Sequence, residues 1–326
     1  MLPKHRVTGS ARLAAGVFVT WVLQGCALVL PQTMELRDAW PEGVPHHTTL
    51  DDVPFFAQDE YQCGPAALAT MLNYAGVDVT PGDLAREVYL PSRLGSLQAE
   101  MAAAARRHGI VSYQLKPRYE DLLREVAAGN PVIVLQDYGV WPVSIWHYAV
   151  VVGFDRASGR ATLRSGVKRE LVMPLAVLEY TWKESDYWSL VTLAPGNIPA
   201  TANETSYLDA VRAMARIAAP PIAERAYAGF LARWPGNETA SVGLAASLYA
   251  QGRLPDAEVA LRRALDRHPA SVPLLNNLAQ TLSDEGRNDE ALALLDRALA
   301  IQGAFTDDAK ETRALVLNRR GAATSR

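Results

Sequence analysis

The sequence predicts an α+β domain followed by an all-α repeat region. Apolar residues recur at helical spacing over 65–76, whereas 146–155 is a nearly continuous apolar run rich in β-branched residues, which is typical of a buried strand. Beyond Gly196 the composition turns to Ala, Leu and Arg, and similar residues return with a period of about 34 positions. Because 326 residues exceed one typical domain, these patterns indicate two successive units.

The N-terminus has the composition of an export signal. Lys4, Arg6 and Arg12 form a basic head, and residues 13–23 form an apolar run. The run is shorter than the roughly 20 residues that cross a bilayer as a helix, and it matches the apolar region of a secretory signal. We therefore expect residues 1–25 to be a signal peptide.

The apolar run ends in Leu23-Gln24-Gly25-Cys26, which resembles the lipobox of bacterial lipoproteins. The resemblance implies that Cys26 is lipidated and becomes the first residue of the mature protein. In Gram-negative lipoproteins, a residue other than Asp after this cysteine, here Ala27, implies the outer membrane. We therefore expect a lipoprotein of the cell envelope, on the periplasmic face of the outer membrane in a Gram-negative cell. A plain signal peptide and a short buried helix are the alternatives.

Lipidation of Cys26 would leave Cys63 without a partner inside the chain, because the sequence has two cysteines. A lone thiol in an oxidising compartment is buried and inert, paired between chains, or retained for its reactivity. A small core residue is the usual explanation of a lone cysteine. The residues around Cys63 favour reactivity instead.

Cys63 is expected at the start of a helix. Pro65 suits the first helical turn, Gly76 suits a helix end, and the positions between them carry a buried apolar stripe. The free N–H groups and the dipole at a helix start stabilise a thiolate, which is the nucleophilic form of cysteine. This position therefore gives a physical reason for a reactive thiol.

The segment Gln-Cys-Gly-Pro-Ala-Ala-Leu at 62–68 resembles the bacteriocin-leader (double-glycine) peptidases, which have a papain-like fold. The resemblance covers about 49–195 and implies an α+β papain-like cysteine peptidase domain with Cys63 as the nucleophile. It also implies a glutamine a few residues earlier that binds the oxyanion. Gln58 fits this position, and Gln62 is the fallback. Donors aimed at a developing oxyanion often make the largest single contribution to catalysis.

His147 is the candidate base among six histidines. It opens the run His-Tyr-Ala-Val-Val-Val-Gly, which resembles the histidine strand of the same family. A histidine in an apolar strand is more often a satisfied core residue, but its place after the Cys63 motif favours catalysis. The others fall in the signal, before the domain, at a helix end or in the repeats: His5, His46, His47, His108 and His268.

The third catalytic position departs from the family. There an Asp or Asn on the next strand orients the histidine, and the matching position in this chain holds Ser165. Asp155 lies at the far end of the histidine's own strand, roughly 26 Å away at about 3.3 Å per residue, and cannot replace it. Ser165 could accept a hydrogen bond from the imidazole without adding charge. The alternative is an ordinary serine at a strand end.

The remaining elements of this domain complete the α+β pattern. Helices are expected at 81–89, 96–108 and 118–128. Strands are expected at 132–136, 147–155, 160–165 and 187–193, which predicts an antiparallel sheet after the catalytic helix. Residues 26–48 and 196–203 are expected to be linkers on either side of the domain.

The C-terminal part carries the tetratricopeptide signature, in which small residues recur where paired helices touch. The recurring residues are Ala257, Leu261, Ala264 and Pro269, followed by Ala291, Leu295, Ala298 and Gly303. We expect an all-α tetratricopeptide repeat solenoid over 204–320, in which 306–320 is a capping helix. The alternative is an unrelated array of helical hairpins. Because stacked repeats leave a groove, this region is expected to bind a partner protein.

These features predict a cysteine peptidase that hydrolyses peptide bonds of a protein or peptide. No cofactor, metal or nucleic acid is expected, because the chain has no phosphate loop or metal-spaced cluster and its net charge is −3. A non-catalytic peptide-binding adaptor is the alternative, and acyl transfer by the same residues is a third reading. The double-glycine specificity of the family is not expected here, because its members carry it beside transporter segments.

Overall fold

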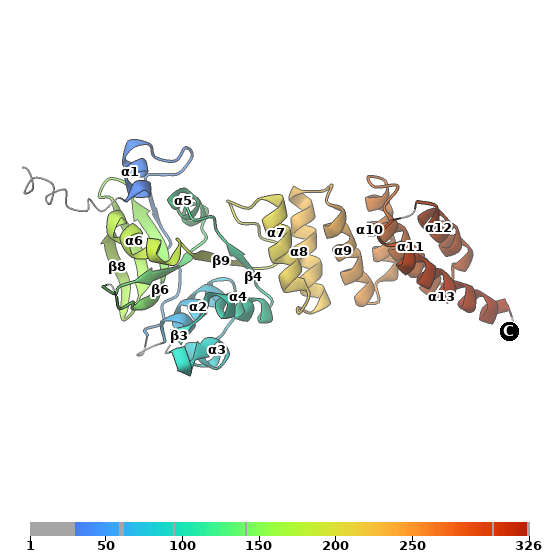
Figure 1. The fold of residues 1–326 in the computed structure, drawn as a ribbon, viewed down its shortest axis with the longest axis horizontal. Helices are drawn as coiled ribbons and strands as arrows, with labels where there is room; N and C mark the ends of the chain where they lie inside the picture. Colours follow the sequence, from blue (N-terminus) through green and yellow to red (C-terminus); the bar gives the residue numbers. More distant parts are fainter. Residues whose placement is uncertain (1–29, 59–61, 94, 141, 302, 325–326) are drawn as a thin grey trace, which may run out of the picture.

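The computed structural model describes residues 30–58, 62–93, 95–140, 142–301 and 303–324. The expected signal peptide and Cys26 lie outside these residues. The described chain forms a domain of mixed helices and strands followed by a row of helices, and the two lie end to end (Figure 1). The predicted fold class, an α+β domain followed by an all-α repeat region, is confirmed.

An antiparallel sheet forms the centre of the N-terminal domain. Six of its seven strands follow the order β4–β9–β5–β6–β7–β8, and β1 pairs with the end of β6. The strands are β1 (His47–Thr49), β4 (Val111–Gln114), β5 (Val132–Asp137), β6 (Trp146–Asp155), β7 (Arg160–Ser165), β8 (Lys168–Pro174) and β9 (Ser189–Leu193). A separate hairpin joins β2 (Tyr89–Leu90) and β3 (Gly95–Ser96).

Strand β5 shows that the sheet is buried on both faces. Ile133 and Leu135 belong to one hydrophobic core, and Val132 and Val134 belong to the other. This division follows from the strand period of two residues, which sends successive side chains to opposite faces. Strands covered on both faces read as unbroken apolar runs, which is the pattern that the sequence has there.

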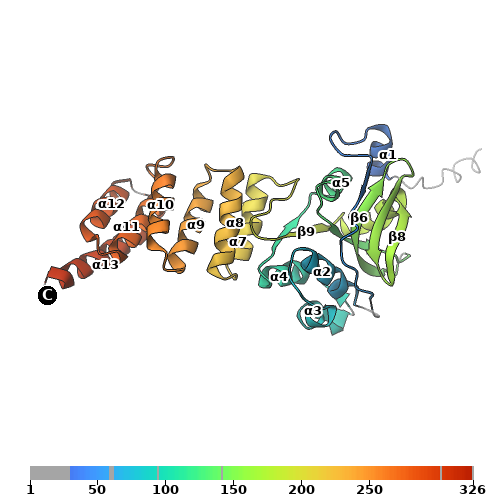
Figure 2. The ribbon, with the colours of Figure 1, turned by 180° about the vertical axis from the view of Figure 1, so that it is seen from behind.

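Helices cover the two faces of the sheet. On one face lie α2 (Cys63–Tyr74), α3 (Pro81–Val88) and α4 (Gln98–Arg107), which are grouped together in Figure 2. The other face is covered by α5 (Tyr119–Ala127) and α6 (Leu175–Trp182). The short turns η1 (Pro91–Arg93) and η2 (Lys183–Ser185) complete the domain.

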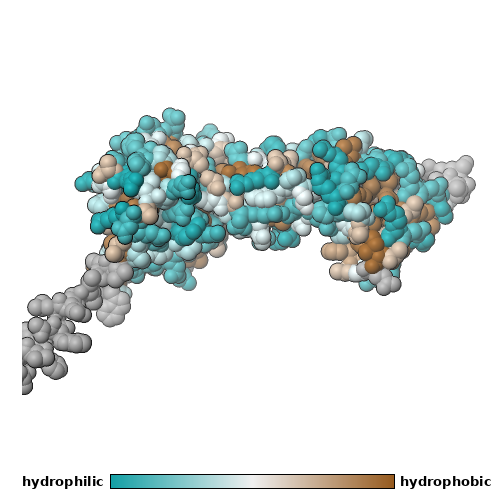
Figure 3. Space-filling model, turned by 90° about the horizontal axis from the view of Figure 1, so that it is seen from above, coloured by the Kyte–Doolittle hydropathy of each residue, from teal (hydrophilic) through white to brown (hydrophobic). Residues whose placement is uncertain are grey.

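The repeat region consists of paired helices. These are α7 (Glu204–Ala215), α8 (Pro220–Arg233), α9 (Glu238–Ala250), α10 (Leu254–Leu265), α11 (Val272–Asp284) and α12 (Asn288–Ile301), and α13 (Thr306–Thr324) follows them. The alanines and leucines of the period are buried where the helices meet, as at Ala257, Leu261, Ala291 and Leu295. In Figure 3 most of the visible surface is hydrophilic, with hydrophobic residues gathered toward one end of the molecule. None of the described helices has the length and apolar composition of a membrane span.

The two regions share one hydrophobic core. Tyr113 of β4 packs edge-to-face on Tyr207 of α7, with ring centroids 6.0 Å apart. The buried carboxylate of Glu125 accepts hydrogen bonds from the N–H and hydroxyl of Thr201 at 2.7 and 2.6 Å, and from the amide of Asn130 at 2.7 Å. The segment 196–203, expected to be a linker, is therefore held against the domain.

The described part of the other expected linker, 26–48, also belongs to the fold, which corrects that prediction. It contains α1 (Pro31–Asp38), whose first N–H groups donate to the buried carboxylate of Glu179. It also contains the start of β1. The reason is the length of β6: β5 covers its edge only as far as Val151, and β1 fills the same edge from Gly153 to Asp155.

Candidate active site

Cys63 is the first residue of α2, as the sequence predicts. Its thiol is partly buried, and the backbone N–H groups of Tyr148, Gly64 and Cys63 itself act to lower the pKa of the thiol. Burial raises the pKa of the thiol, and this effect outweighs the opposite effect of the three N–H groups. In the absence of substrate, the nucleophile is therefore expected as a thiol at neutral pH.

Gly64 allows a close approach between α2 and β3. A Cβ at this position would lie 2.4 Å from the Oγ of Ser96 and 2.7 Å from its Cβ. The Oγ of Ser96 is buried without a hydrogen-bond partner among the described residues, and its carbonyl accepts a hydrogen bond from the Tyr148 hydroxyl at 3.1 Å. Glycine after the nucleophile is thus a packing requirement of this site.

His147 lies near the start of β6, paired with Gln136 of β5. Its Nε2 is 2.9 Å from the Oγ of Ser165, and its ring stacks on Tyr138 with centroids 5.2 Å apart. Burial lowers the pKa of the imidazole to about 4, so the ring is neutral at physiological pH. Among the described residues no carboxylate bonds to this ring, and Asp155 instead accepts from the N–H groups of the turn after β6.

One cavity of about 870 Å³ brings three of the predicted site residues together, whereas Ser165 is not among its lining residues. Cys63, His147 and Gln58 all line it, whereas Gln62 is not among its lining residues. The Gln58 N–H donates to the carbonyl of Gly166 at 3.1 Å, which fixes this residue beside the turn after β7. The thiol and the imidazole face the same space, although no hydrogen bond joins them within the described structure.

The rest of the cavity wall has apolar and charged parts. Leu97, Ile145 and Trp146 are exposed there, with Ile145 at 58% and Trp146 at 48%. The charged side chains on the wall are Arg93, Glu184 and Asp186. In the described part of the chain, no cluster of histidine, cysteine or carboxylate ligands could hold a metal ion.

Sequence reasoning missed the partners that lie behind His147. Tyr138 stacks on the ring and donates a hydrogen bond to Gln136, which is fully buried. The signal in the sequence is the order Gln-Asp-Tyr at the end of β5, because alternate residues of a strand share a face. That signal places Gln136 and Tyr138 on one side but does not show which residue they contact.

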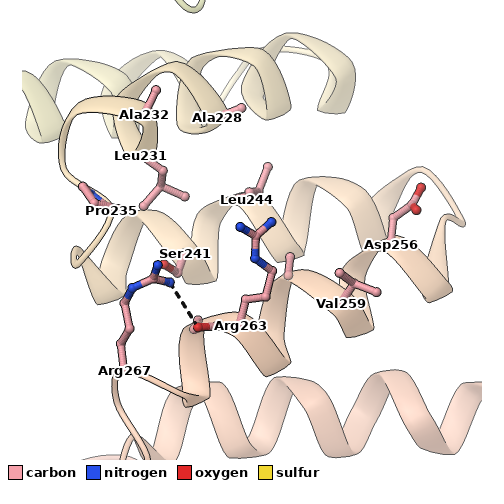
Figure 4. Close-up of a pocket in the computed structure, with 12 residues that line it drawn as sticks. Ala228, Leu231, Ala232, Pro235, Ser241, Leu244, Asp256, Val259, Arg263 and Arg267 are labelled. Carbon is pink, nitrogen blue, oxygen red and sulfur yellow. Dashed lines mark hydrogen bonds between the residues drawn. The ribbon is translucent and has the colours of Figure 1, made fainter.

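A second, smaller groove lies in the repeat region. It has a volume of about 380 Å³ and runs between α8, α9 and α10. Figure 4 shows Leu231 and Leu244 between the helices, with Arg267 and Asp256 at opposite ends. Arg267 donates a hydrogen bond to the carbonyl of Arg263 at 3.2 Å.

Known proteins resemble the two regions separately. The model of the peptidase C39 like family matches residues 50–167, and tetratricopeptide repeat models match 208–272 and 248–312. An uncharacterized protein of Methanothermobacter thermautotrophicus is 32% identical over 129 residues, which are 37% of this chain and 80% of that protein.

Two solved structures are also similar. A putative C39-like peptidase from Bacillus anthracis is 20% identical, covers 46% of this chain and 98% of its own, and has a TM-score of 0.40. MamA is 16% identical, covers 38% of this chain and 82% of its own, and has a TM-score of 0.29. By its family match and its curated relative, the chain belongs to the peptidase C39 like family through its N-terminal domain, which tetratricopeptide repeats follow.

Proposed function

We propose that the N-terminal domain is a cysteine peptidase that hydrolyses peptide bonds of a protein or peptide. The observation that carries this proposal is the cavity that the Cys63 thiol, the His147 imidazole and Gln58 line together. A buried core cysteine and a buried core histidine would have no reason to face one open cavity. The helix start places backbone N–H groups near the thiol, and these partly offset the rise in its pKa that burial causes.

In the proposed reaction, the Cys63 sulfur attacks the carbonyl carbon of the substrate while its proton moves to Nδ1 of His147. Nε2 is already occupied by Ser165, so Nδ1 is the nitrogen free to act as base. The C–N bond then breaks as the imidazolium gives the proton to the leaving amine. Water, deprotonated by the same imidazole, releases the acyl group from sulfur and restores the thiol.

The developing oxyanion needs hydrogen-bond donors on the nucleophile's side of the cavity. The Cys63 N–H belongs to the first residue of α2, where helix N–H groups lack intrahelical partners, and Gln58 lines the same cavity as Cys63. We assign both as the oxyanion donors, with Gln58 held in place by its own backbone bond to Gly166.

The non-catalytic adaptor is the second candidate, and two observations favour it. Thiol and imidazole are not hydrogen-bonded in the described structure, and burial holds the pKa of His147 at about 4, which makes it a weak base. Catalytic hydrogen bonds are often long without substrate and shorten when it binds. The absence of a bond between thiol and imidazole is therefore compatible with the proposed peptidase.

The repeats are proposed to hold a partner or a protein substrate beside the cavity. Tetratricopeptide repeats are interaction modules, and this region is joined to the peptidase domain by a continuous core. We further propose that Cys26 carries a lipid that anchors the protein in the cell envelope. Mass spectrometry of the mature N-terminus tests this, and an unmodified Cys26 would refute the anchor alone.

A peptide library tests the proposed chemistry without knowledge of the substrate. Full-length wild type, Cys63→Ala and His147→Ala are incubated with peptides of mixed sequence, and new termini are identified by mass spectrometry. Peptidase chemistry predicts new termini with wild type, none with Cys63→Ala, and a loss of about a hundredfold or more for His147→Ala. An adaptor would bind peptides in all three forms and create no termini.

A further inference from the structure

The groove in the repeat region is lined by α8 on one side and α10 on the other, with α9 between them (Figure 4). Leu231 of α8, Leu244 of α9 and Val259 of α10 give it an apolar surface. Val259 is 57% exposed, although valine is among the residues most often buried in folded proteins. The rest of the apolar lining consists of Ala228, Ala232, Pro235, Ala260 and Ala264.

Two arginines also line this groove. Arg263 and Arg267 are both exposed, and they lie four residues apart, as Val259 and Arg263 do. Residues at this spacing share one side of a helix, so all three belong to the side of α10 that faces the groove. In Figure 4 both arginine side chains extend from α10 toward α9. The groove therefore combines an apolar surface with two positive charges.

Neither charge is neutralised within the described part of the chain, where no carboxylate pairs with Arg263 or Arg267. The neighbouring Arg262 shows the contrast, because it pairs with Glu258 at 2.7 Å and lies 3.6 Å from Glu290. Each guanidinium has five N–H donors, and Arg267 uses one of them on the carbonyl of Arg263. Most of the donors in the groove are thus available to a ligand.

The arrangement of charges favours an anionic ligand. Two like charges four residues apart destabilise a helix, and the dipole at the C-terminal end of α10 offsets part of this effect. A carboxylate bound between Arg263 and Arg267 would remove the repulsion and accept charge-assisted hydrogen bonds. Asp256, the acidic residue of the lining, is paired with Arg253 at 2.7 Å and does not fill this role.

We propose that this groove binds an internal segment of a partner or substrate protein, in which an acidic side chain lies among apolar ones. The acidic side chain meets Arg263 and Arg267, and the apolar side chains contact Val259 and the two leucines of the lining. The inference rests on the proposed function of the repeats as the part that holds a partner or substrate. It adds the chemistry by which that protein is recognised.

The lining favours an internal segment over a chain end. In Figure 4 apolar residues lie on both sides of Arg263, with Pro235 toward one end of the groove and Val259 toward the other. A ligand whose carboxylate reaches Arg263 therefore finds apolar contacts before and after that point. A C-terminal carboxylate would leave one of these two parts of the groove empty.

The groove is fixed relative to the peptidase domain. Phe230 of α8 and Ala240 of α9 belong to the hydrophobic core that also contains one face of the sheet. Leu231 and Ser241, which follow them in the sequence, line the groove. A protein bound there is consequently held beside the domain that carries Cys63.

The first test measures binding of a peptide with blocked ends, so that its charge comes from side chains alone. The probe is an eight-residue peptide of alternating leucine and aspartate, acetylated and amidated. Isothermal titration calorimetry follows its binding to full-length Cys63→Ala, which lacks the proposed nucleophile. Arg263→Gln and Arg267→Gln, each added to this parent, should weaken binding about tenfold. Arg225→Gln is the matched control, because it removes the same charge from an exposed position of α8 outside the lining.

The second test examines the ligand and the apolar surface. Asparagine in place of aspartate in the probe should weaken binding about tenfold or more. Val259→Asp should do the same, because it places a carboxylate on the apolar surface. Since Val259 is exposed, this variant should unfold at the temperature of the parent, which thermal unfolding followed by circular dichroism checks. If a leucine–asparagine peptide with a free C-terminal carboxylate binds and the blocked aspartate peptide does not, the groove takes a chain end and the proposal is wrong.

The outcomes also separate this proposal from the peptidase chemistry. If the blocked aspartate peptide does not bind the parent, or binds Arg263→Gln and Arg267→Gln as tightly as the parent, the groove proposal fails, and cleavage by wild type would still support the peptidase. If binding depends on the two arginines while wild type cleaves no peptide, the groove proposal stands and the peptidase proposal fails.

Discussion

Replacement of Gly64 by alanine is expected to displace the start of α2 and with it the nucleophile. The new Cβ would lie 2.4 Å from the Oγ and 2.7 Å from the Cβ of Ser96, closer than Cβ atoms come in folded proteins. Rotation of the Ser96 side chain cannot relieve the second contact, because its Cβ is fixed to the backbone. The hydrogen bond from Tyr148 to the Ser96 carbonyl further restrains that backbone.

The size of the effect follows from two opposing contributions. Overpacking a buried site costs about 1–3 kcal/mol, and alanine gains up to about 1 kcal/mol over glycine inside a helix. Gly82 in α3 is the matched control, because its nearest neighbour would be the Thr80 Oγ1 at 3.8 Å. Gly82→Ala should therefore be neutral or slightly stabilising, and Gly64→Ala should be about 1–3 kcal/mol less stable than this control.

Urea unfolding measures the free energies, and iodoacetamide alkylation measures the reactivity of Cys63. We expect Gly64→Ala to react about tenfold or more slowly, because small displacements of a reacting group are costly. The double variant Gly64→Ala/Ser96→Gly removes both clashing atoms and should recover stability and reactivity. Equal free-energy changes in Gly64→Ala and Gly82→Ala, with no recovery in the double variant, would refute the close approach as the cause.

Three further predictions concern the base, the domain junction and the oxyanion donor. The pKa of the His147 imidazole falls from 6.5 to about 4 on folding, so the unfolded chain binds the proton more tightly than the folded chain. The free energy of unfolding should therefore drop by about 2 kcal/mol between pH 8 and pH 5. Urea unfolding of His147→Gln should lack this pH-dependent contribution. Glu125→Gln places an NH₂ group against the N–H and hydroxyl donors of Thr201, which should lower the free energy of unfolding by about 2–3 kcal/mol. Limited proteolysis should then cut within 196–203. If this segment stays as protected as in wild type, its anchoring by Glu125 is wrong. Gln58→Ala should lower the rate of peptide turnover about a hundredfold and leave the rate of iodoacetamide alkylation unchanged. The control Gln62→Ala should change neither rate. An equal loss of turnover in both variants would contradict the assignment of Gln58 as the oxyanion donor.

Local sequence patterns predicted the elements that carry the nucleophile and the base. The stripe between Pro65 and Gly76 indicated the length of α2, and the structure begins that helix at Cys63. The turn after β6 sets the register of the β6–β7 hairpin, which is why Ser165 could be placed beside His147 from the sequence. These features depend on contacts between residues that are near in the chain.

Other features depend on contacts that no local pattern encodes. The bond from Gln136 to Thr181 joins residues in different layers of the fold, and Glu125 reaches Thr201 across the domain junction. The pKa of His147 depends on how deeply the packed domain buries the ring, which cannot be read from an apolar strand. The strand β1 formed because β6 extends beyond β5, a consequence of relative strand lengths.

The most direct measurement is an acylation burst with p-nitrophenyl acetate, an activated ester that requires no knowledge of the natural substrate. The Cys63 sulfur attacks the acetyl carbon, p-nitrophenolate leaves, and the proton of the thiol passes to His147. We predict a burst of about one equivalent of p-nitrophenol per protein, with the acetyl group found on Cys63 by mass spectrometry and the burst lost in Cys63→Ala and strongly slowed in His147→Ala. A wild type without a burst, or a burst that survives in His147→Ala at full rate, would contradict a nucleophile–base pair at this site.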